Sequence, residues 1–318
     1  IESGHVVKTE LPDGNLAMAQ AYVFNLRREK FQDRRVREAL AMMFNFEWSN
    51  AQLFYGLYER VQSFWGNSEL EAKGAPTPGE RAVLQPLVDQ SLLSADILTD
   101  EAVMAPVSGA RQLDRKNLRR ASQLMDEAGW RVNSDGMREK DGQVFTLEVL
   151  DSSPAFDRIT NPMIENMKAL GIDARLNRVD TAQESERTRA YDFDVTTHSM
   201  RMNFEPSSGL EQYFGTKAMD QSSRNLMGLS DPAVDALIEK TVRAQSKAEL
   251  NTNIRALDRV LRAKRFWIPQ WFKAVHTVAY YDQYGYPDPL PPFARGELDF
   301  WWFDADKAAK LKSAGVLN

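Results

Sequence analysis

Helix patterns that alternate with short strand patterns constrain the fold of this chain more than any other feature. The segment DRKNLRRASQLMDEAGW (114–130) repeats apolar residues at helical spacing, and Gly129 stands where a glycine ends a helix. Residues 144–150 then alternate apolar and polar side chains, as a half-buried strand does. A second helix pattern ends at Gly171 and leads into an alternating strand through Leu176. Such strand–helix–strand units predict a mixed α/β domain.

Capping residues and turn residues place the other elements. In chain order, the sequence predicts a strand at Tyr22–Asn25, a helix capped by Asp33, a short helix stopped at Pro86, a helix capped by Ser230 or Asp231, and a helix over 247–265. The tail from residue 266 is aromatic, strand-like and interrupted by prolines.

Composition excludes several classes of function. The chain has 318 residues, no cysteine and a formal net charge of -5. Thiol catalysis, disulfides and cysteine metal sites are therefore excluded, and no general basic character attracts nucleic acid. The basic cluster at 27–37 overlaps a helix start, and we interpret it as a solvated face rather than a nucleic-acid site.

The start of the chain does not have the pattern of a signal peptide. It lacks a basic segment followed by an apolar one, and it lacks Met. No apolar run approaches the roughly 18–20 residues that cross a bilayer. We interpret the chain as processed, or as a piece of a longer protein.

The sequence predicts no catalytic residue, metal site or cofactor. Its histidines are His5, His198 and His276. Neighbours on a strand point to opposite faces, so His198 and Ser199 cannot form a nucleophile–base pair, and no G-x-S-x-G elbow is present. Metal-ligand spacings and nucleotide-binding glycine motifs are absent as well. The remaining enzymatic alternative is a hydrolase that uses His198 with Glu205 or Asp194.

The segment YDFDVTTHSMRMNFEP (191–206) begins as a strand and ends in a mixture of polar and sulfur-containing side chains. A catalytic site, a ligand cleft and an ordinary solvated strand end are the three interpretations. The chain also carries 7 Trp, 9 Tyr and 16 Phe, many in loops with glycine, proline, arginine or asparagine. Rigid aromatic rings next to such residues suit a binding cleft.

Several motifs, taken together and in order, resemble one known family. They are VFNLRREKFQDRRVREALAMMFNFEW, LMDEAGWRVNSDGMREKDGQVFTLEVL, NMKALGIDARLNRVDTAQESERTRAYDFDV and SRNLMGLSDPAVDALIEKTV. They resemble the extracellular solute-binding proteins of family 5, the oligopeptide and dipeptide receptors of bacterial ABC importers. The stretches AQLFYGLYERVQSFWGNSEL and ALDRVLRAKRFWIPQWF are similar to the YejA-type branch, which is associated with peptides, peptide antibiotics and murein peptides.

The resemblance implies the α/β type II periplasmic binding protein fold, in a chain about half as long as family members. Residues 1–21 would connect from a missing first lobe, 22–265 would form the second ligand-binding lobe, and 266–318 would return to complete the first lobe. The N-terminal half would be missing or present as a separate chain. The implied protein is no enzyme: it is periplasmic, its precursor carries a signal peptide, and it delivers an oligopeptide or peptide-like ligand to permease subunits in the inner membrane.

The resemblance also implies where the ligand lies. In this family the residues after the strand equivalent to DFDV line the pocket. The implied ligand-binding residues are His198, Met200, Arg201, Met202 and Asn203, with Phe64, Trp65 and Asn67 near the cleft mouth and Arg224 and Asn225 near the crossing strands.

Arg201 has two interpretations. Oligopeptide receptors place an aspartate in this stretch to pair with the peptide's amino terminus, whereas this chain has Asn203 and Glu205. An arginine can clamp a carboxylate through two hydrogen bonds, so we expect an acidic group of the ligand to face Arg201. The alternative is a surface salt bridge, which contributes little.

Overall fold

A computed structural model describes residues 4–291, 294, 296 and 298–317 of the chain. The chain forms two compact units: a larger one over Met18–Phe272, and a smaller one that combines the two ends, up to Ala17 and from Lys273. The expected bounds of 22 and 265 fall inside the larger unit, because the strands that begin at Ala19 and end at Phe272 pair within it. The assignment of the larger unit as one lobe of a two-lobed receptor stays a prediction.

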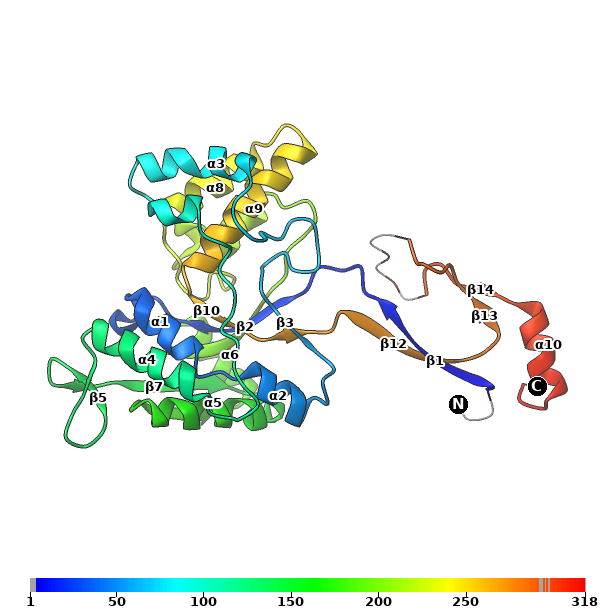
Figure 1. Ribbon diagram of the computed structural model, residues 1–318, viewed down its shortest axis with the longest axis horizontal. Coiled ribbons are helices and arrows are strands. Elements are labelled where there is room, and N and C mark those ends of the chain that lie inside the picture. The colour runs from blue at the N-terminus through cyan, green and yellow to red at the C-terminus, as the bar shows by residue number, and fades with distance from the viewer. Residues whose placement is uncertain (1–3, 292–293, 295, 297, 318) are drawn as a thin grey trace. The chain divides into compact units, whose positions relative to one another are not determined.

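The larger unit is built on a five-stranded mixed sheet with the strand order β10-β2-β9-β7-β8 (Figure 1). Its strands are β2 (Ala19–Phe24), β7 (Thr146–Asp151), β8 (Asp173–Arg178), β9 (Val195–Met200) and β10 (Trp267–Pro269). β7 runs parallel to β8 and β9, while β2 is antiparallel to both β9 and β10. The sequence prediction of a mixed α/β domain is confirmed.

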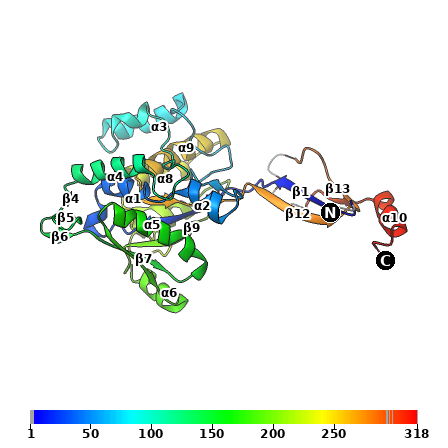
Figure 2. The same ribbon diagram turned by 60° about the horizontal axis from the view of Figure 1, so that its bottom comes forward.

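Helices and small strand pairs surround the sheet (Figure 2). The helices are α1 (Arg34–Ala41), α2 (Phe46–Leu53), α3 (Pro78–Asp89), α4 (Arg115–Glu127), α5 (Asp157–Ala169), α6 (Thr181–Arg189), α7 (Gly209–Phe214), α8 (Pro232–Val242) and α9 (Lys247–Ala263). The small strands are β3 (Glu59–Arg60), paired with β11 (Trp271–Phe272), and the sheet of β4 (Arg131–Val132), β5 (Arg138–Lys140) and β6 (Gln143–Val144). α3 and α8 both contact α9, and the three lie together in Figure 1.

One face of the sheet forms the main core of the larger unit. Tyr22, Phe24, Val149 and Val195 from the strands pack with residues of α1, α4 and α5, and all four are fully buried. These side chains are the apolar members of the alternating patterns, which explains why the register of the strands is fixed.

The predicted helix signals are largely confirmed. Asp33 caps α1 by accepting from Arg35 N, and Asp231 rather than Ser230 caps α8. Gly129 and Gly171 follow α4 and α5 with positive φ values of 88° and 91°. A glycine tolerates that conformation without steric cost.

The predicted helix stop at Pro86 is wrong. α3 continues to Asp89 with Pro86 inside it. Proline removes one intrahelical hydrogen bond, from its own nitrogen to the carbonyl of Ala82. Both residues are exposed, so water can solvate that carbonyl, and the buried Leu84 and Leu87 hold the helix together.

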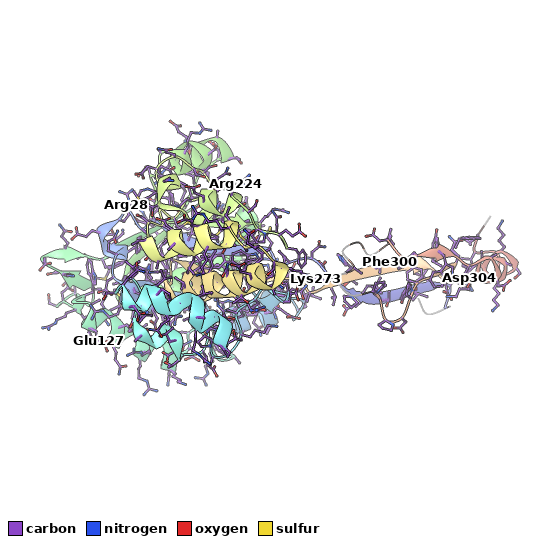
Figure 3. All side chains as sticks on the ribbon, turned by 90° about the horizontal axis from the view of Figure 1, so that it is seen from above. Arg28, Glu127, Arg224, Lys273, Phe300 and Asp304 are labelled. Carbon is purple, nitrogen blue, oxygen red and sulfur yellow. The ribbon has the colours of Figure 1, made fainter. Side chains whose placement is uncertain are left out.

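The smaller unit pairs the two ends of the chain. β1 (Val6–Pro12) runs antiparallel to β12 (Val275–Tyr281), β13 (Tyr284–Gly285) pairs with β14 (Trp302–Phe303), and α10 (Ala305–Ser313) follows, capped by Asp304 (Figure 3). Trp301 packs against Tyr280 and Tyr286, with ring centroids 4.5 Å and 5.1 Å away. Beside this cluster, Leu298, Trp302 and Phe303 are 51–60% exposed.

Candidate ligand-binding edge of the sheet

Five strand ends meet at one edge of the sheet in the larger unit. The parallel strands β7, β8 and β9 have their carboxyl ends there. Because β2 is antiparallel to β9, it begins at this edge, with Ala19 opposite Met200, and β10 ends there. Carboxyl ends of parallel strands are the usual place for ligands in α/β sheets. We call this region the carboxyl edge.

Along the core face, each strand changes from apolar to polar side chains toward the carboxyl edge. In order toward the carboxyl edge, the side chains on this face are Phe24, Tyr22 and Gln20 on β2; Val195, Thr197 and Ser199 on β9; Val149 and Asp151 on β7; Leu176 and Arg178 on β8; and Ile268 of β10 followed by Gln270. Tyr22 and Thr197 are direct partners across β2 and β9, so their side chains lie on the same face. We call Tyr22, Asp151, Thr197 and Gln270 the polar cluster.

The hydroxyl of Tyr22 is central to the polar cluster. It lies 2.8 Å from Thr160 Oγ1 of α5, and the side chains of Gln270 and Asp151 are close enough to influence it. Burial raises the pKa of Tyr22 above its usual range, and the charge of Asp151 raises it further. The phenol therefore stays neutral and can both donate and accept a hydrogen bond.

Asp151 ends β7 as a buried carboxylate, 3% exposed. Its Oδ1 accepts from Ser153 N at 2.7 Å and from Arg178 Nη1 at 3.0 Å. Arg178 also forms an ion pair with Asp157. The second oxygen of Asp151, Oδ2, is buried and has no hydrogen-bond partner, and the same holds for Thr197 Oγ1 and Gln270 Nε2. Three buried polar atoms with unused hydrogen-bonding capacity thus belong to one cluster.

The predicted residues His198 and Met200 lie on the other face of β9. The strand alternation places them opposite Thr197 and Ser199. Nε2 of His198 is 3.2 Å from the carbonyl oxygen of Arg224. Burial lowers the pKa of His198, so the neutral ring donates this bond from Nε2. Met200 is fully buried.

The loop after β9 reaches the surface. Arg201, Asn203 and Glu205 are exposed and Met202 is half-buried. The indole Nε1 of Trp65 donates to the carbonyl oxygen of Asn203 at 3.2 Å, which ties the loop to the segment around residue 65. Within the described part of the chain Arg201 forms no ion pair, so the salt-bridge interpretation gains no support. Its role toward a ligand stays a prediction.

Other predicted residues lie inside the unit or away from this loop. Phe64 and Trp65 are fully buried, and Phe64 stacks on Trp267 at 4.1 Å. Asn225 is also fully buried: its amide nitrogen donates to the carbonyls of Gly215 and Leu229. In this conformation these three side chains hold loops in place and offer no surface to a ligand.

Two further predicted residues, besides Arg201 and Asn203, are on the surface. Arg224 is exposed and its guanidinium lies 5.2 Å from the ring centroid of Tyr213 (Figure 3). Asn67 is exposed and has a positive φ of 63°. The structure therefore brings together His198 with Arg224, and Trp65 with the loop after β9, while Phe64 and Asn225 are buried.

The geometry opposes one form of the hydrolase alternative. Asp194 precedes β9 and His198 lies four residues on, a separation of about 13 Å at ~3.3 Å per residue. The carboxylate of Asp194 is instead bound by Lys30 Nζ at 2.7 Å and by Glu148 N at 3.0 Å. Asp194 therefore cannot orient the imidazole of His198.

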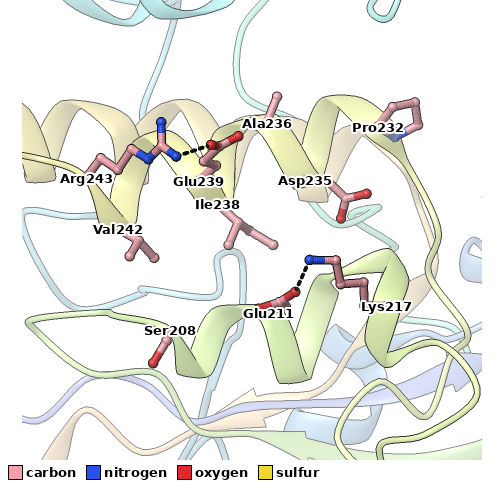
Figure 4. A pocket seen from close by; sticks show the side chains of 10 residues that line it. All are labelled: Ser208, Glu211, Lys217, Pro232, Asp235, Ala236, Ile238, Glu239, Val242 and Arg243. Atoms are coloured by element: carbon pink, nitrogen blue, oxygen red, sulfur yellow. Dashed lines mark ion pairs between the residues drawn. The ribbon is translucent and has the colours of Figure 1, made fainter.

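A separate hollow of about 600 Å³ lies between α7 and α8 (Figure 4). Glu211 pairs there with Lys217 at 3.6 Å, and Glu239 with Arg243 at 2.8 Å. Asp235 also lines the hollow and accepts from Thr216 N at 2.8 Å. None of the predicted site residues lines it.

Neither a metal-ligand cluster nor a membrane-spanning helix occurs among the described residues. Among them, no group of three or more histidine, aspartate or glutamate side chains is placed to hold a metal ion. No helix there is both long enough and apolar enough to span a membrane.

The polar cluster was not predicted from the sequence. The available signal was the break in apolar alternation within LEVLD, where Asp151 occupies the position after Leu147 and Val149 on the same face. A similar change from Val195 to Thr197 occurs in VTTHS. Asp151 and Thr197 lie close together only because β7 and β9 are neighbouring strands, and the order of the strands is known only from the fold.

Comparisons with known proteins identify the family. Residues 6–221 match the model of the bacterial extracellular solute-binding proteins, family 5. The chain belongs to this family. The probable peptide-binding protein YejA of Agrobacterium fabrum is 39% identical over 306 residues, which are 95% of this chain and 49% of that protein. The uncharacterized protein y4wM of Sinorhizobium fredii is 38% identical, over 99% of this chain and 48% of its own length. This chain of family 5 thus spans about half the length of the curated relatives that it matches.

Solved structures share the fold. The oligopeptide-binding protein AppA from Bacillus subtilis, in complex with a nonapeptide, superposes with a TM-score of 0.65 at 16% identity, covering 94% of this chain and 52% of AppA. The murein tripeptide binding protein MppA of Escherichia coli gives 0.59 at 16% identity, covering 94% and 50%. The type II periplasmic binding protein fold predicted from the resemblance is confirmed, as is the family.

Proposed function

We propose that this chain is the C-terminal half of the substrate-binding component of an ABC importer that captures oligopeptides or peptide-like compounds. The polar cluster carries the proposal. A peptide backbone presents both donors and acceptors at every residue, and the cluster offers both, as Asp151 Oδ2, Thr197 Oγ1 and Gln270 Nε2. Its position at the carboxyl edge is where α/β sheets bind ligands.

The relatives support a peptide-like ligand. One is named a probable peptide-binding protein, and the peptidoglycan-binding protein YepA of Agrobacterium fabrum is 29% identical over 95% of this chain. We therefore include murein peptides and peptide antibiotics among the ligands. In this proposal Arg201, exposed on the loop after β9, binds an acidic group of the ligand. The protein has no catalytic activity, and His198 contributes to the structure of the site.

The N-terminal half of the receptor is the first partner of this chain. The smaller unit has exposed side chains of Leu298, Trp302 and Phe303, and apolar patches of this kind mark interaction surfaces. We propose that residues 266–318 complete a first lobe whose remaining part is that N-terminal half. The assembled receptor is periplasmic and delivers its ligand to permease subunits in the inner membrane.

Native mass spectrometry of the protein purified from its source, followed by denaturation of the same sample, tests the proposal. We expect a second polypeptide of comparable mass to the 36.2 kDa chain, or a single longer chain, together with a released small peptide. The peptide's mass defines the ligand class. A preparation that releases no small molecule, and whose melting temperature is unchanged by tri-, tetra- and penta-alanine, would contradict a peptide-binding function.

A further inference from the structure

We propose that the buried carboxylate of Asp151 binds the amino terminus of the ligand. The inference rests on the proposed function, because it assigns one group of the proposed peptide ligand to one place on the carboxyl edge. It differs from the expectation for the loop after β9, where oligopeptide receptors of this family carry an aspartate and this chain does not.

The charges around Asp151 favour a cation. Asp151 and Asp157 are two carboxylates, and Arg178 is the cation that pairs with both. The group is therefore left with one net negative charge. Asp151 Oδ2, which receives no hydrogen bond, is buried in this setting. Such an oxygen costs about 1–3 kcal/mol or more when it stays unpaired, so native structures seldom leave one without a partner.

Neighbouring groups favour an amino terminus over an isolated amine. An ammonium group has three donors and needs several acceptors. Thr197 Oγ1, on the adjacent strand β9 and the same face, is a second unpaired acceptor. Gln270 Nε2, on the other side of β2 and beside the Tyr22 hydroxyl, is a donor that makes no hydrogen bond of full geometry, and its side-chain oxygen is held by Gln20 Nε2 at 2.7 Å. A peptide amino terminus joins an ammonium to a carbonyl oxygen three bonds farther on, which matches this order of two acceptors and one donor.

The loop after β9 fits this orientation. Arg201 is exposed there and repels an ammonium group, while it attracts a carboxylate. A ligand whose amino terminus lies at Asp151 therefore presents its acidic group, or its carboxyl end, toward the side of the edge that carries Arg201.

The test compares two probes that differ by one amino group. Tri-alanine and its desamino analogue, propionyl-alanyl-alanine, are titrated calorimetrically into the assembled receptor, that is, this chain together with its N-terminal half. We expect wild type to prefer tri-alanine at least ten-fold, Asp151→Asn to abolish the preference, and Thr197→Val to reduce it several-fold. Asp157→Asn separates the two parts of the argument: it cancels the net negative charge of the group but keeps Asp151 Oδ2, so it should lower the preference less than Asp151→Asn does.

Each outcome separates this inference from the proposed function. A wild-type receptor that binds both probes equally, or an Asp151→Asn variant that keeps the preference, overturns the assignment of Asp151 and leaves peptide binding intact. A wild-type receptor that binds neither probe nor a longer alanine peptide contradicts the proposed function itself. Because the readout is a ratio within each variant, a general loss of affinity from a small structural change does not imitate the expected result. If Asp151→Asn does not fold, the Thr197→Val ratio decides, and an unchanged ratio there overturns the inference.

Discussion

Two groups of buried charged residues in the larger unit differ in how completely they are paired. In the first, α9 presents Asp258, Arg259 and Arg262, each 0–1% exposed, to the loops around residues 64–80 and 100–104. Asp258 accepts from Phe64 N, Ala72 N and Arg262, and Glu80 accepts from Thr77 N, Arg255 and Arg259. All four carboxylate oxygens have donors within the unit, although Arg259 Nε is buried without a hydrogen-bond partner.

The polar cluster is the second group, and it is incompletely paired. Asp151 uses one oxygen and leaves the other without a donor, and two neighbouring side chains also have unused polar atoms. A buried carboxylate whose oxygens all have donors stabilises a fold, whereas an unpaired buried carboxylate oxygen is costly. The difference indicates that the carboxylates around α9 serve the architecture, and it is the reason for our proposal that a ligand completes the polar cluster.

The largest effect that this comparison predicts is on stability. Asp258→Ala leaves the guanidinium of Arg262 buried without its carboxylate, so we expect the free energy of unfolding to fall by about 3–5 kcal/mol. Urea denaturation measures it. The matched control is Glu239→Ala, which removes an exposed ion pair with Arg243 at the same i,i+4 spacing and should cost less than about 0.5 kcal/mol. A loss below about 1 kcal/mol for Asp258→Ala would contradict the architectural role of the first group.

A smaller stability effect is expected in the polar cluster. Asp151→Asn keeps an oxygen that accepts from Ser153 N and Arg178, and it removes a buried carboxylate oxygen that has no donor. We expect the free energy of unfolding to change by less than about 1 kcal/mol, because the lost ion pair and the relieved desolvation offset each other. Urea denaturation of the unliganded protein checks this. A loss as large as that of Asp258→Ala would place Asp151 among the architectural residues.

The sequence was sufficient for the fold and the family because local signals agree with the tertiary structure. The N-cap Asp33, the glycines at 129 and 171, and the alternating strands all describe single elements, and each occurs where it was predicted. The helix stop predicted at Pro86 was wrong because Pro86 is exposed, so water can solvate the carbonyl that loses its hydrogen bond. Whether a proline is exposed depends on the fold and cannot be read from the residue itself.

The candidate site was less accessible from the sequence. The resemblance points to the loop after β9, whose residues Arg201 and Asn203 are exposed. Phe64 and Asn225 are fully buried in this structure, and their role toward a ligand stays a prediction. The polar cluster needed the strand order, because Asp151 and Thr197 lie 46 positions apart in the chain and share a face only through the pairing of β7 with β9. A polar residue at the end of one strand indicates a site only when the ends of the neighbouring strands are also known to be polar.

The smallest expected effect is a dependence of stability on pH that originates at His198. Burial lowers the pKa of His198 below its usual value of 6.5, so the folded protein keeps the ring neutral where the unfolded chain already binds a proton. The unfolded state then holds more protons, and the free energy of unfolding falls as the pH drops below about 6.5 toward the lowered pKa. His198→Gln keeps a donor for the carbonyl of Arg224 but does not titrate, so it should flatten this part of the curve and leave peptide affinity within a few-fold. Urea denaturation between pH 7.5 and 5 measures the slope. Identical slopes for the variant and wild type would place the titrating group elsewhere, and a peptidase activity lost only in the variant would revive the hydrolase alternative.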